Sequence, residues 1–202
     1  MNPFVIGICG GSGSGKTTLL RKISAHLGAS NVSVFSMDNY YLKINKQQKD
    51  QNGVVNFDLP TALNEQQLVQ DLHRLVDGEE IAVQEDFFNS PPDKNETLTI
   101  APKEILIVEG LFLFHYTGVK ERVDFSIFVD VNMDTQLERR VHRDEESRGY
   151  KKEDIIYQWN NHVTPCYNQF ILPYKEKASF VFRNDRNAEA DFKSLTEVID
   201  EK

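Results

Sequence analysis

The chain alternates between short apolar runs and longer amphipathic stretches. The apolar runs predict strands at residues 4–9, 32–36, 105–108, 125–131 and 179–182, because strands covered on both faces carry few polar side chains. The amphipathic stretches predict helices from residue 18, from residue 61 to about 78, and at 135–146, 152–170 and 188–199. Together they predict an α/β fold with a parallel β-sheet core that is covered by helices on both faces.

Two segments interrupt this alternation. Short β-like pieces at 81–83 and 97–100, separated by a Pro-containing segment, predict a small β-hairpin excursion within a substrate-side insert at about 78–102. Residues 43–56 are polar, lack a clear period and are too many for an ordinary connection, so we expect a mobile loop on the substrate side. The next helix is expected to be capped by Thr61 and to end near Gly78.

The turn after the first strand carries the most specific motif. Residues Gly10-Gly11-Ser12-Gly13-Ser14-Gly15-Lys16-Thr17 fit the pattern G-x-x-x-x-G-K-[ST], between a buried strand and a helix as a P-loop requires. Backbone N–H groups of such a loop and the start of its helix bind phosphates, while Lys16 reaches the β- and γ-phosphates and Thr17 binds Mg²⁺. The motif therefore predicts a P-loop NTPase fold that binds a nucleoside triphosphate.

Composition narrows the partners of this site. The 202 residues are enough for a single domain, residues 1–202, and the formal charge of -8 argues against nucleic-acid or anionic-membrane surfaces. A small-molecule substrate fits better. No apolar run is long enough to span a bilayer, and the P-loop starts too early to leave room for a signal peptide, so we expect a cytoplasmic protein. Cys9 and Cys166 are expected to be reduced structural thiols, and the five histidines structural or surface groups.

Phosphoryl transfer also needs a metal ligand, a group that orients the nucleophile and cations that stabilise the moving charge. Glu109 ends an apolar strand, where it could hold Mg²⁺ directly or through water. Asp38 follows the second strand and could accept a proton from a substrate hydroxyl, or simply cap a turn. Asp58 could hold a vicinal diol or be an isolated turn aspartate.

The predicted helix at 135–146 is rich in arginine. Its spacing predicts that Leu137 and Val141 face the core, with Arg143 and Arg148 projecting from a lid over the phosphates. A solvated charged helix, with acidic residues such as Asp144 as pairing partners, is the alternative. The aromatic pair at 87 and 88 fits a core position better than a base-stacking one.

Taken together, these motifs resemble the uridine kinase family, within a wider group that includes phosphoribulokinase, pantothenate kinase and nicotinamide riboside kinase. The landmarks are the P-loop through Thr18, Ser36-Met37-Asp38-Asn39-Tyr40-Tyr41, Asn56-Phe57-Asp58-Leu59-Pro60, Val108-Glu109-Gly110, Phe128-Val129-Asp130, Arg139-Arg140-Val141-His142-Arg143-Asp144 and Ser147-Arg148-Gly149.

The resemblance implies an ATP- or GTP-dependent, Mg²⁺-requiring kinase for the 5′-hydroxyl of a nucleoside, and a homo-oligomer. Lys16, Asp38, Arg143 and Arg148 would be catalytic, with the two arginines in a lid at about 140–152. The nucleotide would be bound by Gly10, Gly11, Ser12, Gly13, Ser14, Gly15, Lys16, Thr17 and Thr18, and the metal by Thr17 and Glu109. The acceptor would be bound by Asp38, Tyr41, Phe57, Asp58, Glu85, Phe87, Arg140, Tyr150 and Gln158.

The acceptor side departs from the uridine kinase pattern. Glu85-Asp86-Phe87 stands where Tyr-Asp-Phe is usual, Ser90 replaces a base-contacting histidine, and Tyr150 replaces a basic residue, although Gln158 is retained. The stretch His162-Val163-Thr164-Pro165 and several others resemble nicotinamide riboside kinases instead. A uridine- or cytidine-like nucleoside and nicotinamide riboside, or another small alcohol, therefore stay open as acceptors.

Two alternatives to a working kinase also stay open. A nucleotide-dependent regulatory binding module is disfavoured, because Asn45-Lys46-Gln47-Gln48 lacks the aspartate of a guanine-reading Asn-Lys-x-Asp motif. A homologue that has lost catalysis is disfavoured by the retention of every transfer residue.

Overall fold

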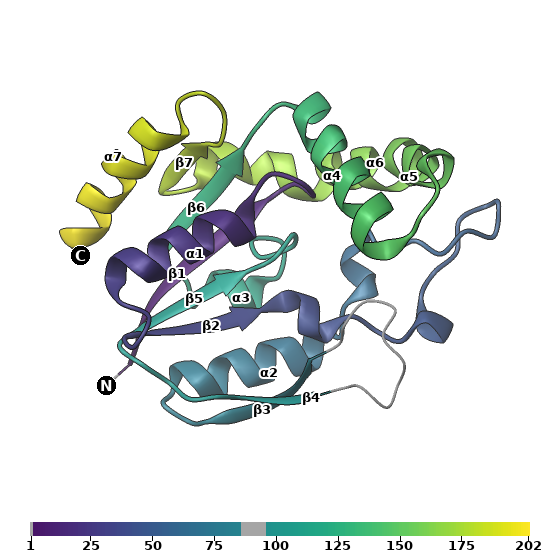
Figure 1. Ribbon diagram of the computed structural model, residues 1–202. Coiled ribbons are helices and arrows are strands. Elements are labelled where there is room, and N and C mark those ends of the chain that lie inside the picture. The colour runs from purple at the N-terminus through teal and green to yellow at the C-terminus, as the bar shows by residue number, and fades with distance from the viewer. Residues whose placement is uncertain (1, 86–95) are drawn as a thin grey trace.

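A computed structural model of the protein describes residues 2–85 and 96–202, without the side chain of Glu85. Its centre is a five-stranded parallel sheet in the order β2-β5-β1-β6-β7 (Figure 1). The strands are β1 (Phe4–Gly10), β2 (Val32–Ser36), β5 (Ile105–Glu109), β6 (Phe125–Asp130) and β7 (Phe180–Arg183). The predicted parallel sheet and its strands are confirmed to within about two residues at each end.

Strand register decides which side chains meet at the carboxyl edge of the sheet. Ile8 of β1 lies beside Glu109 of β5, and Ser36 of β2 lies beside the same glutamate. The P-loop leaves β1 at this edge. Ligands of open α/β sheets bind at the carboxyl ends of the strands, so the register brings three predicted site segments together.

Helices cover both faces of the sheet. Alternate residues of β1 point to opposite faces, with Val5 and Cys9 in one apolar cluster and Ile6 and Ile8 in the other. Helices α1 (Lys16–Leu27) and α7 (Ala188–Asp200) complete the cluster around Ile6 and Ile8. Helices α2 (Glu65–Val76) and α3 (Thr117–Lys120) complete the other (Figure 1). Coverage of both faces is thus confirmed.

The predicted hairpin is confirmed as a separate two-stranded sheet. Strands β3 (Ile81–Glu85) and β4 (Glu96–Ile100) pair antiparallel, with Ile81 opposite Ile100. Both of these end residues are buried against α2 and its neighbours, so the excursion is fixed to the domain at its base. The predicted positions Phe87 and Ser90 lie outside the described residues.

Helix boundaries required one correction. Thr61 was expected to cap the helix after the polar loop, but it lies in a 3₁₀ turn, Pro60–Ala62. The cap of α2 is Asn64, whose side chain accepts the backbone N–H of Gln67. Asparagine is as good a cap as threonine, and Pro60 stabilises the earlier turn. The predicted end near Gly78 agrees with α2.

The second half of the chain forms α4 (Met133–Arg148) and a long helical segment. Gly149, in the left-handed region with φ 66°, ends α4 and separates it from α5 (Lys152–Gln158). The single helix predicted at 152–170 changes pitch. After α5 come a π-helical turn (Trp159–Val163), α6 (Thr164–Cys166), a second π-helical turn (Tyr167–Ile171) and a 3₁₀ turn (Leu172–Lys177).

Residues 43–56, called the polar loop below, are held by hydrogen bonds. The amide of Gln47 donates to the carbonyls of Leu42 and Ala62 at 2.7 and 3.0 Å, and Lys49 forms a β-bridge with Val55. A short 3₁₀ turn, Ile44–Lys46, opens the loop. The loop therefore has a defined shape, while its mobility stays a prediction.

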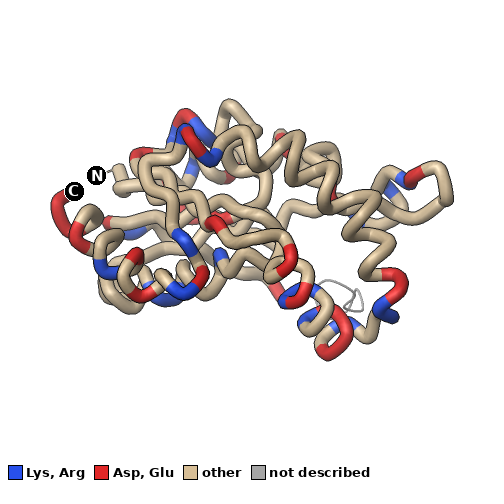
Figure 2. Tube along the Cα trace, turned by 90° about the horizontal axis from the view of Figure 1, so that it is seen from above, with Lys and Arg blue, Asp and Glu red and all other residues tan. Residues whose placement is uncertain are grey.

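The distribution of charged residues and the helices of the structure agree with what the composition predicts. Basic and acidic positions are interspersed along the described part of the chain, with no uniformly basic element there (Figure 2). Within the same residues, no helix combines the length and apolarity that a membrane crossing needs. Cys9 and Cys166 are free and buried, as predicted, and burial raises the pKa of the Cys9 thiol to about 12.

Leu72→Ala tests the packing of α2 on the sheet. The Leu72 side chain is fully buried in the cluster shared by β1 and α2. Its truncation should lower the free energy of unfolding by roughly 2–5 kcal/mol through lost burial and a residual cavity. Urea unfolding measures the change. Leu98→Ala, at a residue 39% exposed on β4, should cost far less; equal losses would contradict this packing.

Candidate active site

The P-loop folds as its glycines predict. Gly13 and Gly15 have φ of 78° and 98°, a region open to glycine, and Gly15 precedes the first residue of α1. A side chain at Gly11 or Gly13 would collide with Gln136 of α4. The Lys16 ammonium donates to the carbonyls of Gly10 and Gly11 at 3.1 and 3.2 Å. The loop thus packs against α4 and curls around its own lysine.

The P-loop is also held by two residues to which the sequence assigned no role. Asn184, which follows β7, donates from its side-chain amide to the Ser14 carbonyl at 2.6 Å. Arg139 of α4 donates to the same carbonyl at 3.3 Å and to the carbonyl of Asn184 at 3.3 Å. In a trans peptide the carbonyl and the next N–H point opposite ways. Fixing the Ser14 carbonyl therefore orients the Gly15 N–H.

A cleft of about 810 Å³ opens beside this loop at the carboxyl edge of the sheet. It brings together most of the predicted site residues from five parts of the chain. Those that line it are Ser12, Gly13, Gly15, Lys16, Thr17, Thr18, Asp38, Tyr41, Phe57, Asp58, Glu109, Arg140, Arg143, Arg148, Tyr150 and Gln158. The other three P-loop residues, Gly10, Gly11 and Ser14, are buried and do not line the cleft.

Glu109 and Asp38 lie at the strand ends of the cleft. The Ser36 hydroxyl donates to Glu109 at 2.7 Å and accepts the backbone N–H of Asp38 at 3.3 Å, so one serine connects both acidic segments. Burial raises the pKa of Glu109, and the nearby Asp38 adds to this, while Lys16 opposes it. A cation at this position would remove the repulsion between the two carboxylates.

The donor atoms at this end fit Mg²⁺. Thr17 and Glu109 offer a hydroxyl and a buried carboxylate in the same cleft, and Mg²⁺ prefers oxygen ligands. Among the described residues, no group of three or more His, Cys, Asp or Glu side chains could hold a metal alone. That is consistent with Mg²⁺ sites in which one or two protein groups act together with substrate phosphates and water.

A buried arginine connects the two ends of the cleft. Arg140 is 7% exposed and donates to the Ser12 hydroxyl at 3.0 Å and to the Gln158 side-chain carbonyl at 3.3 Å. The same guanidinium lies 3.7 Å from Asp58 and 3.3 Å from Asp144. One side chain thus touches the P-loop, α5 and the segment after the polar loop.

Asp144 gathers the lid arginines. Its carboxylate is 1% exposed and pairs with Arg143 at 2.8 Å and Arg148 at 3.1 Å in addition to Arg140. Burial lowers the pKa of Arg148, and Arg143 lowers it further. A solvated charged helix was the alternative for this segment. Asp144 is instead a buried carboxylate that holds three guanidinium groups at the cleft.

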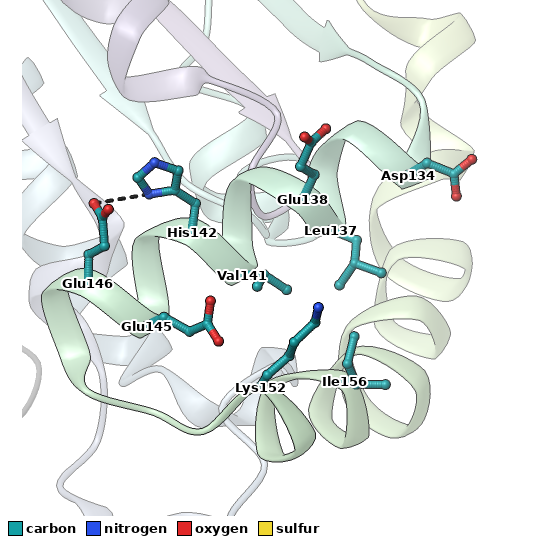
Figure 3. A pocket seen from close by; sticks show the side chains of 9 residues that line it. All are labelled: Asp134, Leu137, Glu138, Val141, His142, Glu145, Glu146, Lys152 and Ile156. Carbon is teal, nitrogen blue, oxygen red and sulfur yellow. Dashed lines mark ion pairs between the residues drawn. The ribbon is translucent and has the colours of Figure 1, made fainter.

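The buried face of α4 was predicted wrongly. Its buried residues are Gln136, Arg140 and Asp144, spaced four apart. Leu137 and Val141 are only partly buried and point toward Ile156 of α5 in a second cavity of about 530 Å³ (Figure 3). Hydrophobic periodicity predicts that the apolar side of a helix faces the core. In α4 the polar side is buried instead, because its side chains contact the P-loop and the arginines of the cleft.

The end of the cleft that is predicted to bind the acceptor has aromatic walls. Tyr41 and Phe57 lie edge to face with ring centroids 6.2 Å apart, and Tyr150 and Gln158 face the same space. Burial, Asp38 and Asp58 raise the pKa of Tyr41 well above its usual value, so its hydroxyl stays protonated. Of the predicted acceptor residues, Glu85 lies in β3 with an undescribed side chain, and Phe87 lies outside the described residues.

Sequence reasoning missed other residues of this region. His162 was expected to be structural or on the surface, but it lines the cleft, and its Nε2 lies 2.8 Å from Asp50 of the polar loop. Asn184 lies in no motif, and Arg139 stands in a family landmark that gave it no role. A signal existed only for Asp144, which follows Arg140 by four residues, the spacing of a helical ion pair.

Comparisons with known proteins identify the family of the chain. The sequence profile of the Phosphoribulokinase / Uridine kinase family matches residues 5–190. Uridine-cytidine kinase B of Dictyostelium discoideum is 33% identical over 89% of this chain and 74% of its own length. Uridine kinase of Staphylococcus haemolyticus is 34% identical over 89% of this chain and 87% of its own.

A solved structure supports the fold. A "possible uridine kinase" from Bacillus stearothermophilus superposes with a TM-score of 0.61 at 20% identity, over 90% of this chain and 89% of the other.

Asn184→Ala tests the clamp on the P-loop. Loss of the amide donor leaves the Ser14 carbonyl with Arg139 alone and lets the Gly15 N–H reorient, so affinity for a nucleoside triphosphate should fall roughly five- to tenfold. Isothermal titration measures it. Asn168→Ala, at an exposed position of the second π-helical turn, should bind normally. Unchanged affinity in Asn184→Ala would refute the clamp.

Asp58→Asn tests the cost of burying a carboxylate. Burial raises the pKa of Asp58 above its unfolded value of 3.8, although Arg140 opposes the shift. The folded state then binds the proton more tightly, so stability falls as pH rises from the unfolded pKa toward the raised one. Asp58→Asn should therefore unfold at higher urea than the parent at pH 7.5, with the gap closing at acid pH.

Arg140 keeps Asp144 as counter-ion in the Asp58→Asn variant. The exposed Asp154→Asn is the matched control and should show no comparable pH-dependent gain. A loss of stability in Asp58→Asn at pH 7.5 would mean that the ion pair outweighs the burial penalty.

Proposed function

The chain belongs to the Phosphoribulokinase / Uridine kinase family, and from this premise we propose that it transfers the γ-phosphoryl group of Mg²⁺-bound ATP or GTP to the 5′-hydroxyl of a nucleoside. A uridine- or cytidine-like nucleoside is the acceptor that its curated relatives favour, since those relatives are named uridine and uridine-cytidine kinases.

The cleft is the observation that carries this proposal. A phosphoryl-transfer site needs a phosphate cradle, a metal position, a group that orients the nucleophile and cations for the transferred charge. One cleft, of about 810 Å³, holds a candidate for each need. Lys16 would bind the phosphates, Thr17 and Glu109 the metal, Asp38 would orient the nucleophile, and Arg143 and Arg148 would supply the cations.

On the donor side, backbone N–H groups of the P-loop and the start of α1 attract the phosphates. Lys16 would exchange its bonds to Gly10 and Gly11 for phosphate oxygens. Bound Mg²⁺, held by Thr17 and Glu109, would neutralise phosphate charge and help to fix the terminal phosphate. Arg143 and Arg148, presented by Asp144, supply donors for the charge that develops on the moving group.

On the acceptor side, Asp58 and Arg140 are placed to bind a ribose diol, one as acceptor and the other as donor. Asp38, exposed in the 3₁₀ turn Met37–Tyr40, would accept the hydrogen of the 5′-hydroxyl and orient it for in-line attack. Tyr41, Phe57, Tyr150 and Gln158 form the space for the base. Glu85, at the end of β3, and Phe87 complete the proposed acceptor set.

An acceptor screen tests the proposal. Consumption of Mg-ATP and Mg-GTP is measured with uridine, cytidine, other nucleosides, nicotinamide riboside, pantothenate and ribulose 5-phosphate. Fastest turnover with uridine or cytidine is expected. Preference for nicotinamide riboside would instead make this compound the acceptor, in line with the altered residues Ser90 and Tyr150. Nucleotide binding without turnover of any acceptor would contradict the kinase and favour a regulatory module.

We also propose a homo-oligomer for the working enzyme, which light scattering of the purified chain can test against the mass of 23.2 kDa. A mass equal to one chain under assay conditions would contradict it.

Asp38→Asn tests the catalytic role of the strand-end carboxylate. The amide keeps the size of the side chain but no longer accepts the hydroxyl hydrogen as a charged base, so kcat should fall roughly 10²–10⁴-fold. Nucleotide affinity should change less than about twofold, because Asp38 is not expected to touch the phosphates. Steady-state kinetics and nucleotide titration separate the two. Wild-type kcat in this variant would rule out the role.

A further inference from the structure

One carboxylate fastens the polar loop to the helical segment that begins with α5. Asp50 accepts the Tyr157 hydroxyl at 2.6 Å and the His162 Nε2–H at 2.8 Å on one oxygen. Its other oxygen accepts the backbone N–H groups of Asn52 and Val54 at 2.8 and 3.0 Å. The carboxylate thus shapes the turn of the loop and binds that turn to the helix at the same time.

The change of pitch after α5 makes this double contact possible. Tyr157 and His162 are five residues apart, which in an α-helix places them about 140° apart around the axis. Here the backbone N–H of Thr164 bonds to the carbonyl of Trp159, five residues back, in a π-helical turn. The wider turn brings the two rings to one side, with centroids 5.9 Å apart and planes at 86°. π-Turns of this kind often occur at functional sites.

The chemistry of the contact defines its donors. Hydrogen bonds from Tyr157 and His162 hold the pKa of Asp50 well below its usual range, so the group is a carboxylate and only accepts. The Nε2 of His162 therefore carries a hydrogen. Asn52 adds a bond from its side-chain amide to the Tyr157 hydroxyl at 2.6 Å. The Tyr157 hydroxyl thus accepts from Asn52 and donates to Asp50.

The cluster joins two walls of the cleft. Ile44 and Val55, at the two ends of the polar loop, line the acceptor side, and Gln158 and His162 line it from the helical segment. Asp50 belongs to the loop and connects it to the helical segment through Tyr157 and His162. This contact therefore ties together two segments that line the same cleft.

We propose that Asp50, Tyr157 and His162 are positioning residues that set the width of the acceptor side of the cleft and so determine which acceptor is bound productively. This inference rests on the proposed kinase function. It assigns these residues no contact with the reacting atoms. Their loss should weaken acceptor binding and leave the P-loop side unchanged.

Steady-state kinetics of three variants test the proposal, with the preferred acceptor of the wild-type enzyme. Asp50→Asn and Tyr157→Phe each remove one partner, and both should raise KM for the acceptor roughly tenfold or more, the size of a lost hydrogen bond to a charged group. KM for Mg-ATP should change less than about twofold. Tyr174→Phe removes a hydroxyl from a partly buried tyrosine outside the cluster and should change neither KM.

Substitution of His162 separates a hydrogen-bond role from simple packing. His162→Gln keeps an N–H near the Nε2 position and should retain most of the acceptor affinity, whereas His162→Met fills the space without a donor and should behave like Asp50→Asn. The double variant Asp50→Asn/His162→Met should be no worse than Asp50→Asn alone, because Asp50→Asn already weakens the only contact that His162→Met removes from the cluster. Equal rises in both KM values, or additive losses, would overturn the proposal.

Hydrogen exchange gives a readout that needs no turnover. Backbone amides at 48–56 should exchange several-fold faster in Asp50→Asn and Tyr157→Phe than in the wild type or Tyr174→Phe. Unchanged exchange would overturn the proposed contact even in an active kinase. If exchange is faster in the variants but the chain phosphorylates no acceptor, the contact made by Asp50 is confirmed. The kinase function, on which the role of this contact in acceptor selection depends, is then rejected.

Discussion

The buried guanidinium of Arg140 is the contact on which the rest of the site depends. It touches Ser12 of the P-loop, Gln158 of α5 and the region of Asp58, so the donor and acceptor ends of the cleft share one side chain. A buried charge is costly unless it is paired and hydrogen-bonded. Asp144 supplies the charge, and the planar fork of arginine donors lets one group reach partners in several directions.

This requirement explains why α4 buries its polar side. Gln136 packs against the glycines of the P-loop, Arg140 fills the cleft floor, and Asp144 collects the lid arginines on the same stripe. A bulkier residue at Gly11 or Gly13 would push the helix away and separate these contacts. The P-loop and α4 are therefore parts of one packed unit, to which Arg140 connects the region of Asp58. Asp50 in turn attaches the polar loop to Tyr157 and His162.

Local signals were enough to predict the sheet and the strand-end acids. Parallel strands align their carboxyl ends, so Asp38 and Glu109 could be expected at the same edge from their positions alone. Periodicity failed for α4, because a scale of apolarity cannot recognise a buried ion-pair network. It also could not reveal that Asn184 holds Ser14 from 170 residues away, or that a π-turn would bring Tyr157 and His162 together. These features depend on tertiary contacts.

Because Arg140 contacts both Ser12 of the P-loop and the region of Asp58, it should serve both substrates through its fork of donors. The most direct measurement is the pair of KM values, for nucleotide and for acceptor, in Arg140→Lys. Lysine keeps the charge near Asp144 but cannot reach Ser12, Gln158 and Asp58 together. Both KM values should rise in this single variant, while circular dichroism should show that the protein stays folded. A rise in only one KM, or in neither, would contradict this role of Arg140.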